Sequence, residues 1–441
     1  MQSPLSKQLQ YGFLAMPISA MAITILVFFP KFILDSNILT PTILGGIILF
    51  VKVFDFIIDP IFGRMSDEFK SKGYTRSFFV KNSYMPLGIL FSLLFLYPLF
   101  INNFNLINSW FSIVSLSLFL IVFFIFWTSL NISYQSLGVE LESDYHRRTK
   151  LLGIRDAFII IGTLVATILP VLISTKLDFL ETHAQWFIIA CFYFFLSFVG
   201  VFLIKKLKEP KQIIKSEPIN FKGLKNNRPF YILSVFFILT GFGSTMSATT
   251  ILIYLESILE ISNGGLYLFI FFLSSLLFFP LWMRLAKKFE KKLTLIIAMI
   301  ITSLAFMGVL FLEKGDHILY LILIILSGIG IGGCLIIPSS MQADIAEFDG
   351  LINKTDRRAS LISIWSLLNK ASASIAAGLA FPILGYFGYK SGILINNDLK
   401  LAIKILYAGI PLFCYFLATI AIIFYPLDKN KLEKIKILEQ N

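Results

Sequence analysis

Charged side chains are scarce in this chain of 441 residues: they make up 15% of it, whereas hydrophobic residues make up 57%. The mean hydropathy of +0.82 lies outside the range of soluble globular proteins of this size. This shortage of charge excludes an ordinary soluble domain. We therefore expect a membrane protein.

Residue types that usually carry catalysis or bind metals are also few. The three histidines, at positions 146, 183 and 317, share no spacing that would bring them together. No serine nucleophile elbow, P-loop or dinucleotide fingerprint occurs in the sequence. The three cysteines all lie in apolar segments, where buried and unreactive thiols are expected rather than disulfides. These absences argue against an enzyme and against a cofactor or a resident metal.

Long apolar runs, by contrast, recur along the whole chain, and each is long enough to span a bilayer, which takes about 20 residues. Membrane β-barrels alternate polar and apolar residues, whereas these runs are apolar on all sides. The sequence thus predicts an all-α membrane protein with twelve transmembrane helices. The expected spans are 11–34, 40–63, 77–101, 109–135, 151–175, 184–204, 229–257, 264–283, 293–312, 317–341, 359–388 and 402–426.

Basic residues are distributed unevenly among the expected loops. They gather around 64–76, 147–150, 284–292 and 357–358, whereas the loops 102–109 and 256–263 have none. By the positive-inside rule the basic loops are cytoplasmic, and an even number of helices places both termini there too. The net charge of +12 is then a signal of topology rather than of nucleic-acid binding. The Lys-, Ile- and Phe-rich composition suggests a bacterial protein of the cell inner membrane.

Two similar halves are indicated by sequence repeats. PIFGRMSDEF, from Pro60, has the same spacing of proline, arginine and phenylalanine as PLWMRLAKKF, from Pro280. RRTKLLGI, from Arg147, and RRASLISI, from Arg357, share a second pattern. We therefore predict two six-helix bundles related by duplication. They are residues 1–204 and 229–427, with a cytoplasmic linker at 205–228 and a cytoplasmic tail at 428–441.

Two acidic residues, Asp55 and Asp59, lie within the second apolar run. Residues four apart share one helical face, so both side chains should project together into the bundle. A carboxylate in the membrane interior is costly unless a cation, a proton or a basic partner neutralises it, and two neighbouring carboxylates repel each other. The pair therefore indicates a cation-coupling site. The alternative is a permanent ion pair with Lys52, three residues before Asp55.

The motif around these acids resembles that of a known family. The run D55-x3-D59-P60-x2-G63-x3-D67-x5-G73-x2-R76, with ADIAEFDG at 343–350 and Asn369-Lys370, is similar to the melibiose-carrier-like glycoside-pentoside-hexuronide:cation symporters of the major facilitator superfamily. The resemblance covers most of the chain. It implies a secondary active transporter that moves a small polar solute, such as a sugar, a glycoside or a sugar acid, with H⁺ or Na⁺ by alternating access.

The resemblance also implies site residues on other helices. Thr128 and Asn131 fall on cation-site positions of the fourth helix, and Asn131 stands where the sugar carriers have an aspartate in contact with both sugar and cation. This departure, together with Ile58 in place of a polar neighbour, removes oxygen ligands and favours a proton over sodium as the coupling ion. Alternatively, the side chains of Thr128 and Asn131 bond a helix backbone or a neighbouring helix.

The expected substrate residues come from both halves. Ser19 and Ile18 occupy places where the melibiose carriers have a sugar-binding aspartate and a lysine, which argues against a galactoside. Asn131 and Arg155 match sugar-site positions, although Arg155 is equally explained as a snorkelling interfacial residue, with Asp156 facing another way. In the second half, Lys370 could neutralise a carboxylate of the substrate or of the other half. Trp365 could stack on a sugar, or it could be a packing or lipid-facing residue that anchors the helix.

Acidic residues interleave with the cytoplasmic arginines and suggest ion pairs that latch an inner gate during alternating access. Surface charges that set orientation explain the arginines but not the acids. The predicted gate residues are Arg64, Asp67, Arg76, Glu140, Asp144, Arg147, Asp344, Asp349, Arg357 and Arg358.

A transporter of lysolipids or other amphiphiles with the same fold is the alternative function. The 47 phenylalanines would suit an apolar path, but they are spread along all the helices, as expected for lipid-facing side chains. For either function we expect a monomer whose partners are the solute and the lipid bilayer, without nucleic acid.

Overall fold

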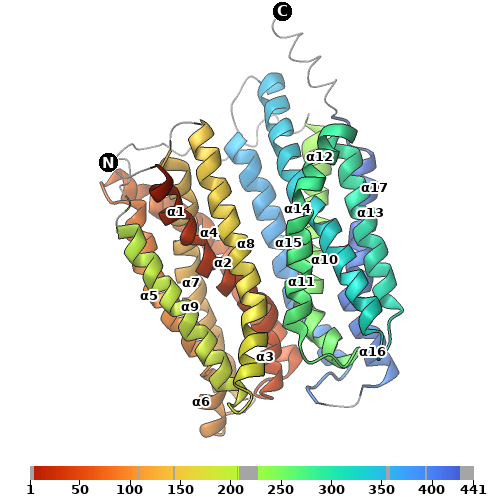
Figure 1. Cartoon of the computed structure of the whole chain (residues 1–441). Coiled ribbons are helices and arrows are strands. Elements are labelled where there is room, and N and C mark those ends of the chain that lie inside the picture. The colour runs from red at the N-terminus through yellow and green to blue at the C-terminus, as the bar shows by residue number, and fades with distance from the viewer. Residues whose placement is uncertain are drawn as a thin grey trace, which may run out of the picture. The chain divides into compact units, whose positions relative to one another are not determined.

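The computed structural model of the chain describes residues 4–107, 109–142, 145–205, 207, 227–353, 358–392 and 395–427. Throughout these ranges the regular secondary structure is helical, and no strand occurs in them (Figure 1). Helices suit a bilayer because each satisfies its backbone hydrogen bonds within one segment. The prediction of an all-α membrane protein is therefore confirmed.

The chain divides by packing into two compact units. Unit 1 is Met1–Ser216 with Gly388–Ile393, and unit 2 is Glu217–Phe387 with Leu394–Asn441. The predicted linker at 205–228 falls almost entirely outside the described residues, and the predicted tail at 428–441 lies wholly outside them. The boundaries proposed from the sequence for these two segments stay a prediction.

Unit 1 contains nine α-helices and one π-helical segment within its described residues. They are α1 (Pro4–Phe13), α2 (Ala15–Ile23), η1 (Thr24–Phe28), α3 (Phe29–Asp35), α4 (Pro41–Ser71), α5 (Arg76–Leu94), α6 (Tyr97–Asn103), α7 (Trp110–Glu140), α8 (Tyr145–Lys176) and α9 (Thr182–Lys205).

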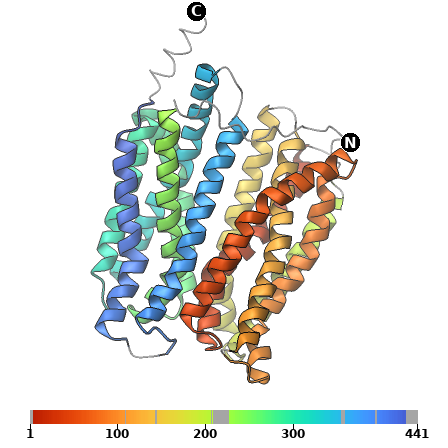
Figure 2. The ribbon, with the colours of Figure 1, turned by 180° about the vertical axis from the view of Figure 1, so that it is seen from behind.

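Unit 2 follows the same plan. Its described helices are α10 (Arg228–Ser257), α11 (Gly264–Leu277), α12 (Phe279–Phe289), α13 (Lys291–Leu310), α14 (His317–Asn353), α15 (Arg358–Tyr386), α16 (Asn397–Lys404), η3 (Ile405–Gly409) and α17 (Ile410–Ile423). Within each unit the long helices run side by side as a bundle, which is visible from both directions (Figures 1 and 2).

The number of membrane spans agrees with the sequence prediction. Ten helices in the described part of the chain are long and apolar enough to cross a membrane, and two bent helix pairs bring the number to twelve if each pair is one span. The bent pairs are α5 with α6, at 46°, and α11 with α12, at 40°. We therefore describe the chain as a twelve-helix membrane protein.

The two units repeat one pattern of helix packing. In unit 1, α2 packs on α8, α4 on α7, and α5 on both α7 and α9. In unit 2 the counterparts six spans later pack likewise: α10 on α15, α11 on α14, and α13 on both α14 and α17. Equal packing of equally placed helices is what duplication of a six-helix bundle produces.

Close packing of the first and fifth spans of each unit depends on a glycine. A Cβ atom at Gly162 of α8 would collide with the carbonyl oxygen of Met16 and the hydroxyl of Ser19, both on α2. At the corresponding contact in unit 2, a Cβ atom at Gly241 would collide with the side chain of Asn369. Small residues let helix backbones approach within a membrane, where the hydrophobic effect does not drive helices together.

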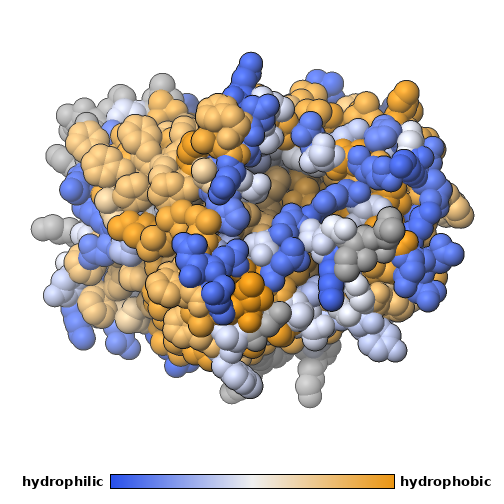
Figure 3. All heavy atoms as spheres, turned by 90° about the horizontal axis from the view of Figure 1, so that it is seen from below, coloured by the Kyte–Doolittle hydropathy of each residue, from blue (hydrophilic) through white to orange (hydrophobic). Residues whose placement is uncertain are grey.

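Polar side chains collect at the end of unit 2 that carries α16. There Glu313, in the loop between α13 and α14, accepts hydrogen bonds from Lys400 and from Lys404, the latter at 2.7 Å. Figure 3 views the molecule from this end and shows hydrophilic side chains among hydrophobic ones. Such a surface suits a loop region that faces water beside a bilayer.

One sequence-based boundary was wrong. The second span was expected to end at residue 63, but α4 continues through Pro60 and Gly63 to Ser71. A proline inside a helix removes only one backbone hydrogen bond, and the turns on either side can still form. As a result, the charged positions after Gly63 lie on a helix rather than in a loop.

Candidate cation site

The position of Asp55 and Asp59 follows from the two faces of α4. Phe50, Val53 and Ile57 are 57%, 46% and 56% exposed, and they form an outer apolar row at helical spacing. Two residues beyond Val53 the helix has turned by about 200°. Asp55 accordingly faces the interior of unit 1 and is only 2% exposed. Asp59, four residues later, shares that inner face.

A threonine from another helix joins the two acids. The hydroxyl of Thr128, on α7, lies 2.7 Å from Asp55 Oδ1 and 3.1 Å from Asp59 Oδ1, and it can donate to either carboxylate. Thr128 itself is 1% exposed. The contact forms because α4 packs along α7. The structure therefore brings three of the four predicted cation-site residues together.

The other polar neighbours make different contacts. Asn131, one turn after Thr128, donates its amide to the carbonyl oxygen of Trp127 in its own helix, at 3.2 Å. The Lys52 ammonium lies 4.1 Å from the ring centroid of Phe124, in a cation–π geometry. These contacts leave the ion-pair alternative for Lys52 open.

The arrangement is chemically suited to hold one small cation or one proton. Two carboxylate oxygens and a hydroxyl oxygen surround the same region of the bundle. Oxygen atoms are the ligands that hard cations prefer. A single proton shared by the pair would also relieve the repulsion between the two carboxylates.

Two of the predicted substrate residues of unit 1, Ser19 and Arg155, make different kinds of contact. Ser19 is buried, and its hydroxyl donates to Met16 O in the same helix at 3.0 Å. Arg155 does not point away from Asp156, as the sequence had suggested. Its Nε and Nη2 atoms donate to Asp156 Oδ1 at 2.9 and 2.7 Å. Long side chains of adjacent helical residues can bend toward each other, which helical spacing alone does not reveal.

In unit 2, Trp365 is fully buried, and its indole N–H donates to the Ser234 hydroxyl at 3.1 Å. Its ring packs near Phe230, with centroids 5.1 Å apart. In this conformation Trp365 fills space between α15 and α10. Lys370 lies five residues further along α15 and is partly exposed. No ligand contact tests the substrate residues, so these assignments remain predictions.

Two of the predicted gate residues meet in a buried charged cluster in unit 1. Glu140, the last residue of α7, accepts from Arg76 Nε at 3.1 Å and from Lys70 Nζ at 2.9 Å. Arg76 also donates to the Ser66 hydroxyl at 2.6 Å. The side chains of Lys70 and Glu140 are 7% and 5% exposed. This Lys70–Arg76–Glu140 cluster fastens α4, α5 and α7 together.

A related ion pair occurs at the corresponding place of unit 2. Lys291, the first residue of α13, donates to both carboxylate oxygens of Asp344 on α14, at 2.8 and 2.6 Å. Arg76 is likewise the first residue of α5, the counterpart of α13. The structure thus adds an ion pair to the repeat that sequence spacing had not revealed.

The remaining gate residues are only partly described. Asp349 is 1% exposed and accepts a hydrogen bond from the Asn227 amide at 3.0 Å. Arg64 and Arg147 are exposed. Asp144 and Arg357 lie outside the described residues, and so do the side chains of Asp67 and Arg358.

Several residues of these clusters escaped the sequence interpretation. From the sequence, Lys70 and Lys291 were interpreted only as basic residues that set the topology, and Asn227 was given no role. Their partners lie 70, 53 and 122 residues away, so local spacing carried no signal for them. One sequence feature could have predicted the ion pairs between the third and fourth spans. In both units a basic residue begins the third span, and an acidic residue lies toward the end of the fourth.

Twelve apolar helices in two similarly packed units, with an acidic pair inside the first, define the class: a multi-pass membrane transporter with the major facilitator fold. The profile of the MFS/sugar transport protein family matches residues 10–429. The chain belongs to this family and, within it, to the glycoside-pentoside-hexuronide:cation symporters, as the motif resemblance indicated. The family and its named relatives are transporters, not enzymes.

Individual relatives are distant. An uncharacterized symporter of Synechocystis sp. is 24% identical over 93% of this chain and 92% of its own length. The isoprimeverose transporter of Lactiplantibacillus pentosus is 23% identical over 91% of this chain and 84% of its own. A sodium-dependent lysophosphatidylcholine symporter of Danio rerio is 24% identical over 38% of this chain and 32% of its own.

A solved structure with the same fold is a bacterial homologue of the iron transporter ferroportin in an inward-facing state. Its TM-score is 0.70 at 15% sequence identity, over 96% of this chain and 99% of that one. At this identity the likeness concerns the fold alone. The relatives named as symporters imply a coupling cation, and the family implies a small-molecule solute.

Proposed function

We propose that the protein couples the movement of a cation to that of a small polar solute across the bacterial inner membrane, with both termini in the cytoplasm. The observation that carries this proposal is the Thr128 hydroxyl within hydrogen-bonding distance of both Asp55 and Asp59. A buried acidic pair must be neutralised, and an exchangeable cation or proton does this while leaving the site reusable in each transport cycle.

The coupling ion in this proposal is H⁺ or Na⁺. A proton needs only the two carboxyl groups, whereas sodium needs additional oxygen ligands. Asn131 stands where the sugar carriers have a carboxylate, so one formal charge is missing from the set. This loss favours a proton, while Thr128 keeps one neutral oxygen beside the pair.

The proposed solute is a sugar, a glycoside or a sugar acid. Support comes from the family and from the isoprimeverose transporter among the relatives. The residues we assign to solute binding are Ser19, Asn131, Arg155, Trp365 and Lys370. The positive charge of Lys370, and that of Arg155 once it exchanges Asp156 for the solute, would suit a sugar acid better than a neutral sugar.

A lysolipid is the second candidate solute, because a lysophosphatidylcholine symporter matches part of the chain. The two candidates differ in what the solute presents to the protein. A sugar needs several hydrogen bonds to hydroxyl groups, whereas a lysolipid needs an apolar path for its acyl chain. A transport panel separates them directly.

The test uses purified protein in liposomes, with labelled sugars, sugar acids and lysolipids supplied under imposed sodium or proton gradients. Asp55→Asn and Asp59→Asn should each abolish gradient-driven accumulation, because an amide does not bind the cation as a carboxylate does. The proteins should remain folded, as shown by an unchanged thermal unfolding profile.

Asp398→Asn is the matched control, since Asp398 is an exposed aspartate in the first turn of α16. Its accumulation should equal that of the wild type. Uptake that ignores both gradients would contradict symport, and normal accumulation by Asp55→Asn would place the coupling site elsewhere.

A further inference from the structure

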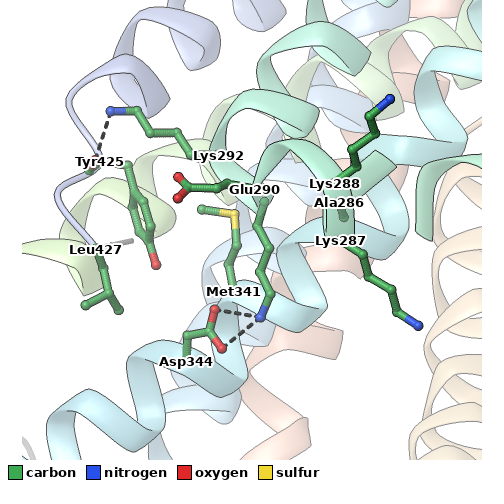
Figure 4. Close-up of a pocket in the computed structure, with 10 residues that line it drawn as sticks. Ala286, Lys287, Lys288, Glu290, Lys292, Met341, Asp344, Tyr425 and Leu427 are labelled. Carbon is green, nitrogen blue, oxygen red and sulfur yellow. Dashed lines mark hydrogen bonds and ion pairs between the residues drawn. The ribbon is translucent and has the colours of Figure 1, made fainter. Parts of the chain in front are cut away.

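A cavity of about 480 Å³ lies at one end of unit 2. It is bounded by the junction of α12 and α13, by α14, and by the segment that follows α17 (Figure 4). Figure 4 shows Glu290, Lys292, Met341, Asp344, Tyr425 and Leu427 around it. The transport proposal gives this cavity no role.

The junction of α12 and α13 provides a helix N-terminus at the cavity. Glu290 joins the two helices with a φ of 67°, so the chain turns sharply and α13 begins at Lys291. No side chain caps the N-terminus of α13. Its first backbone N–H groups therefore keep their donor capacity, and the helix dipole adds partial positive charge there.

Charge at the cavity is positive on balance. Four lysines at positions 287, 288, 291 and 292 line it, against the two carboxylates of Glu290 and Asp344. The side chains of Lys287 and Lys288 extend away from Tyr425 (Figure 4), so these two lysines act through their charge rather than by direct contact. Lys291 is engaged with Asp344. Lys292 donates to the carbonyl oxygen of Tyr425 at 3.1 Å and so holds the segment after α17 against α13.

Tyr425 supplies an independent sign of a missing ligand. The residue is 4% exposed, and its hydroxyl is one of the few buried polar atoms in the described chain that have no hydrogen-bond partner. In Figure 4 the hydroxyl points inward, between Met341, Leu427 and Asp344. Burial and the Asp344 carboxylate raise the pKa of Tyr425, so the group stays protonated and is a hydrogen-bond donor.

The residues around the cavity are of the kinds found where a membrane protein meets the lipid headgroups. Two membrane spans meet at this junction. Phe289 and Leu293, next to the cavity lysines in sequence, are 42% and 47% exposed. Exposed apolar side chains beside lysines are typical of the level at which lipid headgroups lie.

We propose that this cavity binds a phosphate group, held by the α13 N-terminus and the Tyr425 hydroxyl, with the nearby lysines adding positive potential. The carrier of that phosphate is either an anionic phospholipid, whose acyl chains would lie along the exposed apolar side chains, or a free phosphate ion. Uncapped helix N-termini with nearby lysines bind phosphate by the same chemistry in either case.

The experiment measures binding to the full-length protein in a neutral detergent by native mass spectrometry and calorimetry. Three probes are compared: dihexanoylphosphatidylglycerol, inorganic phosphate, and a dihexanoylglycerol glucoside that has no phosphate. The wild type should bind at least one of the two phosphate probes and should not bind the glucoside specifically. Binding should weaken with added salt.

Tyr425→Phe removes only the unpartnered hydroxyl, so the fold should be unaffected, while affinity for the phosphate probe should fall about tenfold. The matched control is Tyr193→Phe, which removes a buried tyrosine hydroxyl from unit 1 and should leave binding unchanged. Lys287→Gln combined with Lys288→Gln should reduce the salt dependence, because both lysines carry an exposed positive charge at the cavity.

The outcomes separate the two sources. Binding of the lipid without competition from phosphate identifies a membrane headgroup, and binding of phosphate alone identifies the soluble ion. Binding that is unchanged in Tyr425→Phe, or equal for the glucoside, overturns the proposal.

Discussion

At the scale of single residues, the Thr128 hydroxyl has an unusual position because it serves two carboxylates at once. Most threonine hydroxyls in this chain donate to a carbonyl oxygen one turn earlier in their own helix, as Thr167 does to Thr163 at 3.3 Å. Thr128 instead contacts side chains of a different helix. Its hydroxyl therefore contributes to the geometry of the acidic pair rather than to α7.

Thr128→Val should weaken cation-coupled transport without unfolding the protein. Valine has the same shape but lacks the oxygen, and a hydrogen bond to a charged group contributes about 2 kcal/mol. We expect the cation concentration for half-maximal uptake to rise roughly 10-fold to 100-fold. Thr128→Ser should stay close to the wild type.

Thr167→Val is the matched control, since Thr167 is 0% exposed and bonds only within its helix in the described contacts. An equal change in both variants would indicate a general effect of losing a buried hydroxyl and would remove Thr128 from the site.

The spacing of residues in the sequence predicts which way some side chains point, but it does not predict which distant side chains they contact. The inward direction of Asp55 and Asp59 follows from their position on the face opposite Val53 and Ile57. The pairing of Lys70 with Glu140 could not be predicted, because it depends on how three helices pack at a separation of 70 residues. The contact between Arg155 and Asp156 depends on side-chain rotamers, which spacing does not determine.

At the scale of helices, the two corresponding ion pairs differ in burial. The side chains of Lys70 and Glu140 are 7% and 5% exposed, whereas those of Lys291 and Asp344 are 35% and 28% exposed. A buried carboxylate that serves two cations is far more costly to remove than a partly hydrated one.

Glu140→Gln should therefore lower the free energy of unfolding by about 3 kcal/mol, because the change removes a buried carboxylate that accepts hydrogen bonds from both Lys70 and Arg76. Asp344→Asn, the matched variant in unit 2, should cost less than about 1 kcal/mol. Chemical denaturation in a mild detergent, followed by tryptophan fluorescence, measures both. A larger loss in Asp344→Asn would contradict the assigned roles.

Helix existence was easier to predict than helix length. The twelve apolar runs correspond to the observed spans because the bilayer demands about 20 apolar residues per crossing. The ends of α4 and α14 extend well beyond their apolar runs, to Ser71 and Asn353. Hydropathy marks where a helix leaves the lipid, whereas the helix itself ends only where its backbone hydrogen bonds stop.

At the scale of the whole molecule, the main pairs of packed helices repeat between the two units, but their chemistry does not. The unit 1 copy of the PxxxR motif follows two aspartates, and the unit 2 copy at Pro280 has none. Both copies keep a charged contact between the third and fourth spans of their unit. Duplication has thus preserved the architecture, while the acidic pair is confined to unit 1.

The predicted orientation places the loop at 102–109 outside the cell and the loop at 72–75 in the cytoplasm. In a variant with all three native cysteines replaced, Asn103→Cys should react with a membrane-impermeant maleimide on intact cells. Lys72→Cys should react only after lysis. Both positions are exposed, so access depends on the side of the membrane alone. The reverse pattern would mean an inverted topology.

The continuity of α4 has a mechanical consequence. Its 31 residues form a rod about 46 Å long at 1.5 Å per residue, with the acidic pair near its middle and Lys70 near its end. Pro60 has no backbone N–H to donate to the carbonyl oxygen of Phe56, so α4 bends most easily in the turn from 56 to 60, which contains Asp59. A change of tilt in this turn would therefore move Lys70 and its contact with Glu140 directly, because the helix continues from Asp59 to Lys70 without a loop.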